Sequence, residues 1–233
     1  MRRWPTPADL AQAQKSEVIT RWGRLGYPRR ALRLHECAVA ITENFGGQVP
    51  DNEVQLRSLP GIGEYTAAAI TAFAFNNRSL VLDINIRRLF ARHIDGVELP
   101  HSAVTKSERA SRSELIPEKN PHVWAAATME LGALICTAKN PKCGHCPIAA
   151  TCTWRSLDYP KSDQPKRTQA WHGTDRQCRG VIVQALRENE SLSKRKLLQL
   201  WEVPSQAEKA LTTLLADGLI EKVQRDSYRL PAS

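Results

Sequence analysis

The sequence contains no uninterrupted apolar stretch of about 18 residues, the length at which a membrane-spanning helix is predicted. Its first residues, Met1–Pro5, carry two arginines and lack the apolar core of a signal peptide. Only six cysteines occur among 233 residues, too few for a disulfide scaffold. These absences predict a cytoplasmic protein with no membrane segment, in a compartment where thiols stay reduced.

Acidic residues are outnumbered: 33 Lys and Arg oppose 24 Asp and Glu, which gives a formal net charge of +9. The basic excess is spread over both halves of the chain and is not confined to a tail. Such a balance favours a polyanionic partner, although charge alone does not define a fold.

Apolar residues recur at helical spacing through most of the chain. The pattern predicts helices over residues 8–25, 30–45, 52–59, 65–75, 84–93 and 121–135. Asp51 is the expected cap of the third of these helices. No clear strand pattern precedes residue 180, so the main part of the chain is predicted to be all-α.

The stretch 155–174 is rich in Pro, Lys, Gln and Ser and has no apolar period, which is typical of a linker. Behind it the pattern predicts helices over 176–187, 193–201 and 205–217, followed by strands over 219–223 and 228–230. Ser193 is the expected cap of the second helix. Three helices followed by a β-hairpin resemble a small winged-helix module.

The segment Leu59-Pro60-Gly61-Ile62-Gly63 separates two of the predicted helices. Its two glycines permit a tight turn and a close approach of another backbone. The helix that follows begins with free N–H groups, which can bind a phosphate. The segment therefore predicts a helix-hairpin-helix clamp on a DNA backbone; an ordinary turn between two helices is the alternative.

Four of the six cysteines, Cys136, Cys143, Cys146 and Cys152, lie within seventeen residues. Four thiolates so close in sequence can bind one metal centre. Zinc ribbons usually supply two Cys-x2-Cys pairs and this loop has one, so an iron–sulfur cluster is favoured and zinc stays the alternative. Cys37 and Cys178 lie outside the loop and are expected to pack in a core.

Five segments together resemble the helix-hairpin-helix DNA glycosylase superfamily, most closely its adenine DNA glycosylase (MutY) branch. They are residues 22–27, 59–63, 81–88 and 129–133 and the four-cysteine loop. The resemblance covers residues 4–152. It implies base excision repair of double-stranded DNA, in which adenine mispaired with 8-oxoguanine or guanine is flipped out and excised. It also implies a 4Fe-4S cluster on the four cysteines.

With this resemblance the chain divides into a glycosylase core at 1–135, an iron–sulfur loop at 136–154, a linker at 155–174 and a winged-helix-like module at 175–233. Asp83 matches the aspartate that stabilises the oxocarbenium-like sugar, and Asn85 the residue that holds this aspartate and the DNA backbone. An aspartate before a helix would also serve as an N-cap.

Tyr65 stands where bifunctional relatives carry a lysine that forms a Schiff base, so the resemblance implies a monofunctional enzyme. A tyrosine at this position also resembles thymine-mismatch glycosylases. Tyr27 matches the tyrosine that wedges into the stack beside 8-oxoguanine; a core aromatic is the alternative. Further candidate DNA contacts are Leu59, Gly61, Ile62 and Gly63 of the hairpin, and Arg29, Arg30, Arg87, Arg88, Lys139 and Lys142.

The chain departs from the family at both ends. Relatives carry a segment before the point that matches Trp4, with a glutamate that protonates adenine as a general acid. Glu17 matches a later, non-catalytic helix, so no residue is assigned to this role. Either Met1 is an internal residue of a longer protein or the chain is shortened. We expect the chain as written to be nearly inactive.

In place of the family's NUDIX-like domain, the chain ends in the winged-helix-like module. Its basic residues, Arg176, Arg179, Lys194, Arg195 and Lys196, predict additional DNA contacts; a module that only packs against the core is equally consistent. Two other functions stay open: a thymine or uracil mismatch glycosylase, and a DNA-binding protein without catalysis. A monomer associated with the bacterial nucleoid is expected.

Overall fold

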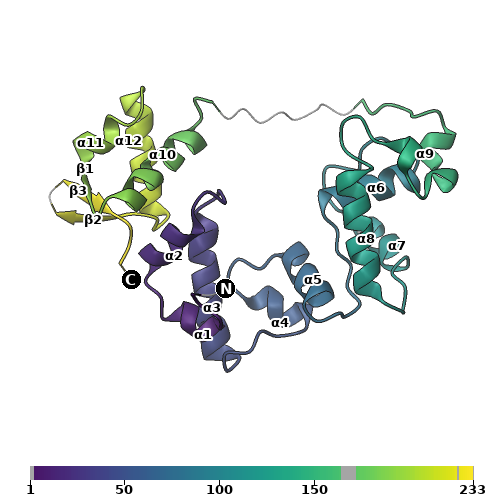
Figure 1. The fold of residues 1–233 in the computed structure, drawn as a ribbon, viewed down its shortest axis with the longest axis horizontal. Helices are drawn as coiled ribbons and strands as arrows, with labels where there is room; N and C mark the ends of the chain where they lie inside the picture. The colour runs from purple at the N-terminus through teal and green to yellow at the C-terminus, as the bar shows by residue number, and fades with distance from the viewer. Residues whose placement is uncertain (1–2, 164–171, 225, 233) are drawn as a thin grey trace. The chain divides into compact units, whose positions relative to one another are not determined.

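The computed structural model describes residues 3–163, 172–224 and 226–232. Helices dominate these residues, and three short strands form one small sheet close to the C-terminus (Figure 1). The chain divides into two compact units. Unit 1 combines Met1–Pro50, Leu59–Gly61 and Arg167–Ser233, and unit 2 combines Asp51–Ser58 and Ile62–Lys166. The mainly helical fold confirms the predicted class.

Unit 1 begins with α1 (Pro7–Ala11), α2 (Lys15–Trp22) and α3 (Arg29–Asn44). The single helix predicted over 8–25 is therefore wrong, because the chain leaves the helix after α1 and adopts an extended conformation at Gln14. The Thr6 side chain accepts a hydrogen bond from the Asp9 N–H and caps α1. α2 ends at Gly23, whose φ of +55° lies in the left-handed region.

The C-terminal part of unit 1 holds α10 (Asp175–Glu188), α11 (Lys194–Leu198) and α12 (Pro204–Ala216). β1 (Leu192–Ser193), β2 (Glu221–Gln224) and β3 (Ser227–Arg229) pair antiparallel in the order β1-β3-β2. Ser193 caps α11, as predicted. The two predicted strands are shifted by one or two residues, because Leu219 and Ile220 are buried in the core ahead of the sheet.

One hydrophobic core joins the two ends of the chain within unit 1. Val18 and Ile19 of α2 lie in the same cluster as Ile182 of α10 and Leu214 of α12. Cys178 belongs to this cluster and is fully buried, and Cys37 is also buried, both as expected. The winged-helix-like module thus shares its core with the N-terminal helices; the domain boundaries drawn from the sequence stay a prediction.

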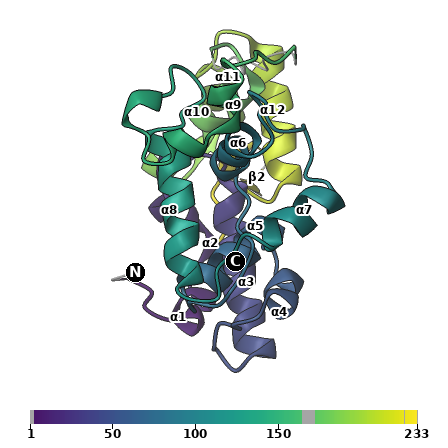
Figure 2. The ribbon, with the colours of Figure 1, turned by 90° about the vertical axis from the view of Figure 1, so that its right-hand side faces the viewer.

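Unit 2 is helical and contains the cysteine loop and the helices on either side of the hairpin. Its helices are α4 (Glu53–Ser58), α5 (Glu64–Phe73), α6 (Ile84–His93), α7 (Lys106–Ser113), α8 (Pro121–Leu134) and α9 (Thr153–Ser156). Single 3-10 turns cover Cys143–His145 and Ala149–Thr151. α8 packs against α6, which also contacts α9 (Figure 2).

A small core of unit 2 surrounds α6, where Ile86 and Phe90 are buried and Phe90 stacks on Trp124 at 5.8 Å between ring centroids. The expected cap of α4 was wrong: the Asn52 side chain, and not that of Asp51, accepts a hydrogen bond from the Gln55 N–H at 3.0 Å. α6 has the predicted bounds.

Several expectations concern residues outside the described ranges. They include Met1 and Arg2 at the start of the chain and residues 164–171 of the predicted linker. In the part of the chain that the structure describes, no helix combines the length and hydropathy of a membrane span.

The shared core of unit 1 makes a prediction about cooperativity. Leu214→Ala, at a fully buried position of α12, should lower the free energy of unfolding by about 2–5 kcal/mol. Because the core is common, hydrogen exchange in α2 and α3 should accelerate with it. Leu215→Ala on the same helix, where the residue is 37% exposed, should cost about 1 kcal/mol or less. Unchanged exchange in α2 and α3 would show that the two parts unfold separately.

Candidate active site and iron–sulfur loop

The hairpin between α4 and α5 has the backbone that its sequence predicts. Gly61 adopts a φ of +78°, and a Cβ atom there would lie 2.8 Å from the Arg33 Cβ, so both conformation and space favour glycine. Gly63 is extended and precedes α5, with no side chain to cap the first N–H groups of the helix. Leu59 is buried, so its side chain serves packing and not the surface.

Asp83 stands at the N-terminus of α6 in an extended conformation and is half-buried. One carboxylate oxygen, Oδ1, accepts a hydrogen bond from the Ile86 N–H at 2.6 Å. The other, Oδ2, accepts a hydrogen bond from the Asn85 side-chain amide at 2.8 Å. The N-cap role is therefore real, and the same contacts fix the direction of the carboxylate.

Tyr65, in the first turn of α5, is 45% exposed. Burial raises the pKa of its hydroxyl, and the negative charge of Asp83 raises this pKa further. The phenol is therefore neutral at physiological pH and lies within electrostatic range of the carboxylate. Of the three candidate catalytic residues, Asn85 contacts Asp83 directly, and Tyr65 interacts with the same carboxylate electrostatically.

Arg88 extends this network from Asn85 into the cysteine loop. Its Nη2 donates to the Asn85 Oδ1 at 3.0 Å and to the Gly132 carbonyl at 2.5 Å. Its Nε donates to the Cys136 carbonyl at 2.8 Å. A Cβ atom at residue 132 would lie 2.6 Å from the Asn85 carbonyl oxygen, so glycine is what lets α8 approach α6 this closely.

Arg92, one turn further along α6, holds the same loop and is 1% exposed. Its Nη1 donates to the Thr137 carbonyl at 2.8 Å and lies 3.6 Å from the Cys136 sulfur. Its guanidinium lies over the Trp154 ring, 4.5 Å from the centroid. The buried Arg92 guanidinium thus lies between the first cysteine of the loop and the Trp154 ring.

The four thiols line one pocket, together with Leu89, Ile148 and Trp154 and other residues of α6 and the loop. Burial raises the pKa of Cys143, and charge on Cys136, Cys152 and Cys146 raises it further, so the four sulfurs interact electrostatically. Bound metal would remove this repulsion between thiolates.

Within the described ranges, no three His, Cys, Asp or Glu side chains converge as the ligands of a single metal ion do. A zinc ion needs four ligands at bonding distance of one point. A four-iron cluster places four iron ions between its thiolates and keeps them farther apart. Four half-buried thiols around one pocket supply the donor set of a four-iron cluster.

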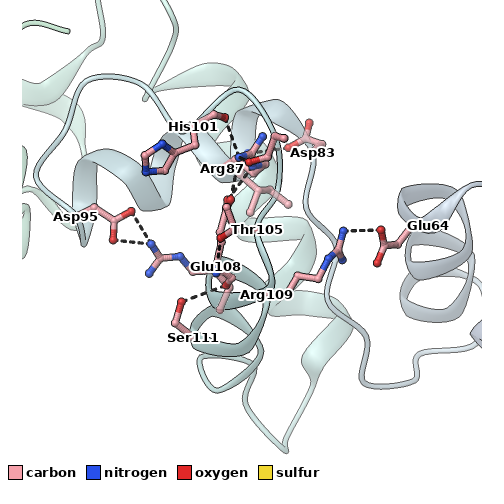
Figure 3. Close-up of polar contacts among 12 residues, drawn as sticks. Glu64, Asp83, Arg87, Asp95, His101, Thr105, Glu108, Arg109 and Ser111 are labelled. Atoms are coloured by element: carbon pink, nitrogen blue, oxygen red, sulfur yellow. Dashed lines mark hydrogen bonds and ion pairs between the residues drawn. The ribbon is translucent and has the colours of Figure 1, made fainter. Parts of the chain in front are cut away.

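Arg87 and Arg88 were predicted to contact DNA, but the structure turns both inward. Arg87 is 6% exposed; its Nε and Nη2 donate to the two Glu108 carboxylate oxygens at 2.7 and 2.8 Å. Its Nη2 also donates to the carbonyls of Ala103 and of His101, which Figure 3 labels beside Arg87. The guanidinium groups are thus committed to acceptors within the protein, and their positions do not support phosphate contacts.

α7 supplies contacts that the sequence analysis missed. Arg109 forms an ion pair with Glu64, the first residue of α5, at 2.5 Å, and Arg112 forms one with Asp95 (Figure 3). The helix has no apolar repeat, and its only sequence signal is the Thr105 cap. α7 therefore braces the helix that follows the hairpin.

The remaining candidate DNA contacts differ in their surroundings. Tyr27 is 55% exposed, and the Trp22 indole N–H donates to the neighbouring Gly26 carbonyl at 2.8 Å. Arg29 lies 3.4 Å from the Asp217 carboxylate, and the Arg30 guanidinium lies over the Trp22 ring. Lys139 and Lys142 are exposed.

Comparisons with known proteins agree with this geometry. Residues 1–112 match the model of the HhH-GPD superfamily of base excision DNA repair proteins. Residues 136–152, which include all four loop cysteines, match the iron-sulfur binding domain of endonuclease III. The chain therefore carries the domain that binds a 4Fe-4S cluster.

Curated relatives are similar over different shares of the chain. An adenine DNA glycosylase from Mycobacterium tuberculosis is 42% identical over 235 residues, which cover 99% of this chain and 77% of the relative. The Homo sapiens adenine DNA glycosylase is 37% identical over 157 residues, covering 66% of this chain and 29% of the relative. The mycobacterial match thus includes the C-terminal module of unit 1.

Solved structures share the fold. A thermostable thymine-DNA glycosylase superposes with a TM-score of 0.60 at 26% identity, covering 67% of this chain and 72% of the other. A non-covalent endonuclease III–DNA complex superposes with a TM-score of 0.58 at 21% identity, with the same coverage.

The Arg87–Glu108 pair makes a prediction about pH. Burial raises the pKa of Glu108, but hydrogen bonds and charge from Arg87 and the Thr105 N–H outweigh it and lower the pKa overall. A carboxyl group whose pKa is lowered by folding stabilises the fold at pH values above its pKa in the unfolded chain. This stabilisation is lost as pH falls through its pKa in the folded chain. The free energy of unfolding, measured with urea, should therefore fall less between about pH 5 and about pH 3 in Glu108→Gln than in the parent chain.

At neutral pH the same substitution should cost about 1–3 kcal/mol, because it removes a charge-assisted pair. Glu114→Gln, at an exposed position at the end of α7, is the control and should change neither quantity. An identical pH dependence in Glu108→Gln and the parent chain would contradict the assignment.

Proposed function

Because this chain belongs to the adenine DNA glycosylase family of helix-hairpin-helix proteins, we propose that it excises adenine by hydrolysing the N-glycosidic bond. The proposed substrate is double-stranded DNA in which adenine faces 8-oxoguanine or guanine, and the product is an abasic site in an uncut strand. The observation that carries this proposal is the Asp83 carboxylate, held at the N-terminus of α6 by hydrogen bonds from the Asn85 amide and the Ile86 N–H.

Asp83 is proposed to stabilise the positive charge that develops on the sugar as the base departs. A negative group fixed before the reaction stabilises such charge without having to reorganise. Each carboxylate oxygen already accepts one hydrogen bond and retains a further lone pair. Asn85 is proposed to hold this carboxylate in place, and the DNA backbone beside it.

Tyr65 is proposed to face the flipped nucleotide without reacting covalently. A phenol cannot form an imine, so the β-elimination that follows a Schiff base is not expected. Excision of mismatched thymine is a second candidate function. Tyr65 resembles the residue at this position in thymine-mismatch glycosylases, and the chain is 26% identical to a thermostable thymine-DNA glycosylase that shares its fold.

The hairpin is proposed to bind one DNA strand through Gly61, Ile62 and Gly63 and the first N–H groups of α5. Such contacts position the protein and carry no sequence information. Tyr27 is proposed to enter the base stack as a wedge. A monomeric state and a location at the nucleoid in the bacterial cytoplasm stay predictions.

Cys136, Cys143, Cys146 and Cys152 are the proposed ligands of the 4Fe-4S cluster. When bound, the cluster supplies a structural link among four points of the loop. Arg88 and Arg92 hold the backbone of the same loop from α6. The thiolates of the loop are thereby tied to the helix that begins at Asp83.

No residue of this chain is assigned as the acid that protonates adenine. General acid catalysis contributes about 10²–10⁴ in rate, in addition to the stabilisation of charge on the sugar. Excision is expected to depend on Asp83.

The test is single-turnover excision by anaerobically purified protein in excess over a duplex with one adenine opposite 8-oxoguanine. Alkali-labile sites are expected to form, with no strand cleavage before alkali and none of these sites with Asp83→Asn. A duplex with thymine opposite guanine is the control for the second substrate class. Equal excision by Asp83→Asn, or faster loss of thymine than of adenine, would refute the proposal. A folded, cluster-containing protein that binds the duplex without excising adenine would favour a DNA-binding role.

A further inference from the structure

The loop after α2 presents an aromatic ring in an unusual backbone conformation. Gly23, Gly26 and Tyr27 all have positive φ, with +46° at Tyr27. A bulky residue with positive φ is an outlier among L-amino acids and needs support from its surroundings. Tyr27 nevertheless stays 55% exposed, so burial of its ring does not provide that support.

Support comes from the other end of the sequence, within unit 1. The Arg176 guanidinium, in the first turn of α10, lies 4.2 Å from the centroid of the Tyr27 ring. Its Nη2 is also 4.0 Å from the position of a Cβ at Gly26. A guanidinium stacks flat on an aromatic face, which a lysine ammonium does not do. The guanidinium thus covers one face of the ring, while the residue as a whole stays 55% exposed.

α10, which carries Arg176, is anchored in the hydrophobic core of unit 1. Cys178 and Ile182 of the helix are fully buried in the core that also contains Val18 and Ile19 of α2. The loop that carries Tyr27 and the helix that carries Arg176 are therefore anchored in the same core. Both side chains line a hollow of about 860 Å³ at the surface of unit 1.

The neighbouring cations of the module are engaged differently. Arg179 pairs with Asp217 and donates to the Thr213 hydroxyl, and Lys194 pairs with Glu208. These two residues were predicted to contact DNA, and each already has an acidic partner in the module. Arg176, in the same module, contacts the exposed Tyr27 ring.

We propose that Arg176 is a positioning residue that holds the Tyr27 ring ready to enter the DNA base stack. This inference depends on one part of the proposed function, the role of Tyr27 as a wedge. The C-terminal module would then act on DNA through the N-terminal loop: the guanidinium stacks on one face of the ring, and a nucleobase stacks on the other. Positive charge beside the ring also suits the polyanionic partner.

The contact itself is tested without DNA. The four tyrosines are replaced by fluorotyrosine in the full chain, and the Tyr27 resonance is assigned with Tyr27→Phe. Arg176→Ala should shift and narrow this resonance, because the ring loses its stacking partner. Arg195→Ala, which removes an exposed cation from the same module, should leave it unchanged. An unaltered Tyr27 resonance in Arg176→Ala would overturn the proposal.

The effect on DNA is tested with a duplex carrying 2-aminopurine next to 8-oxoguanine, whose fluorescence rises on unstacking. Arg176→Ala should reduce this rise about two- to fivefold, with partial recovery in Arg176→Lys. The dependence of affinity on salt should keep its slope. A slope lowered by about one, with a normal fluorescence rise, would identify Arg176 as a phosphate contact instead.

These two readouts separate the further inference from the proposed function. If the parent chain binds the duplex without any rise in fluorescence, the wedge role of Tyr27 fails, whatever the resonance of Tyr27 shows. If the rise occurs and is equal in Arg176→Ala, the wedge stands and the positioning role of Arg176 fails.

Discussion

The buried guanidinium of Arg88 is the group on which the candidate site depends. A cation taken out of water is costly unless every donor finds an acceptor, and Arg88 donates to the Asn85 side chain and to two backbone carbonyls. Those acceptors belong to the start of α6, to α8 and to the cysteine loop. One side chain thus specifies how three segments far apart in sequence meet.

This arrangement makes the iron–sulfur loop part of the support of the candidate active site. Cys136 is held through its carbonyl by Arg88 and lies beside Arg92 through its sulfur. A loop closed by four metal–thiolate bonds would keep the Cys136 carbonyl in place. This carbonyl fixes Arg88, Arg88 fixes Asn85, and Asn85 orients the Asp83 carboxylate. The cluster is therefore expected to matter to catalysis through position, without taking part in the reaction.

The parts predicted correctly from sequence are those with local signals. α6 follows from its apolar period, the hairpin from its glycines and the cysteine loop from its spacing. The direction of the Arg87 and Arg88 side chains was not predictable in this way, because it depends on acceptors in helices and loops up to 48 residues away. A basic residue beside a DNA-binding motif looks like a phosphate contact until those acceptors are known.

Two other features lacked a sequence signal for a similar reason. α7 is polar along its length and is held by ion pairs, which leave no apolar period. The core shared by α2 and α10 joins helices more than 150 residues apart, and each helix is amphipathic with no indication of its partner. In the candidate site, residue types were predictable and their mutual positions were not.

The link from the cysteine loop to the carboxylate is tested most directly by a double-mutant cycle of Asn85→Ala and Arg88→Gln. The readout is the single-turnover rate of adenine excision by protein with full iron content. If both residues act through the orientation of Asp83, the double variant should be no slower than the slower single variant. Arg109→Gln combined with Asn85→Ala is the control and should give multiplied losses. Multiplied losses for Asn85→Ala and Arg88→Gln would contradict the link.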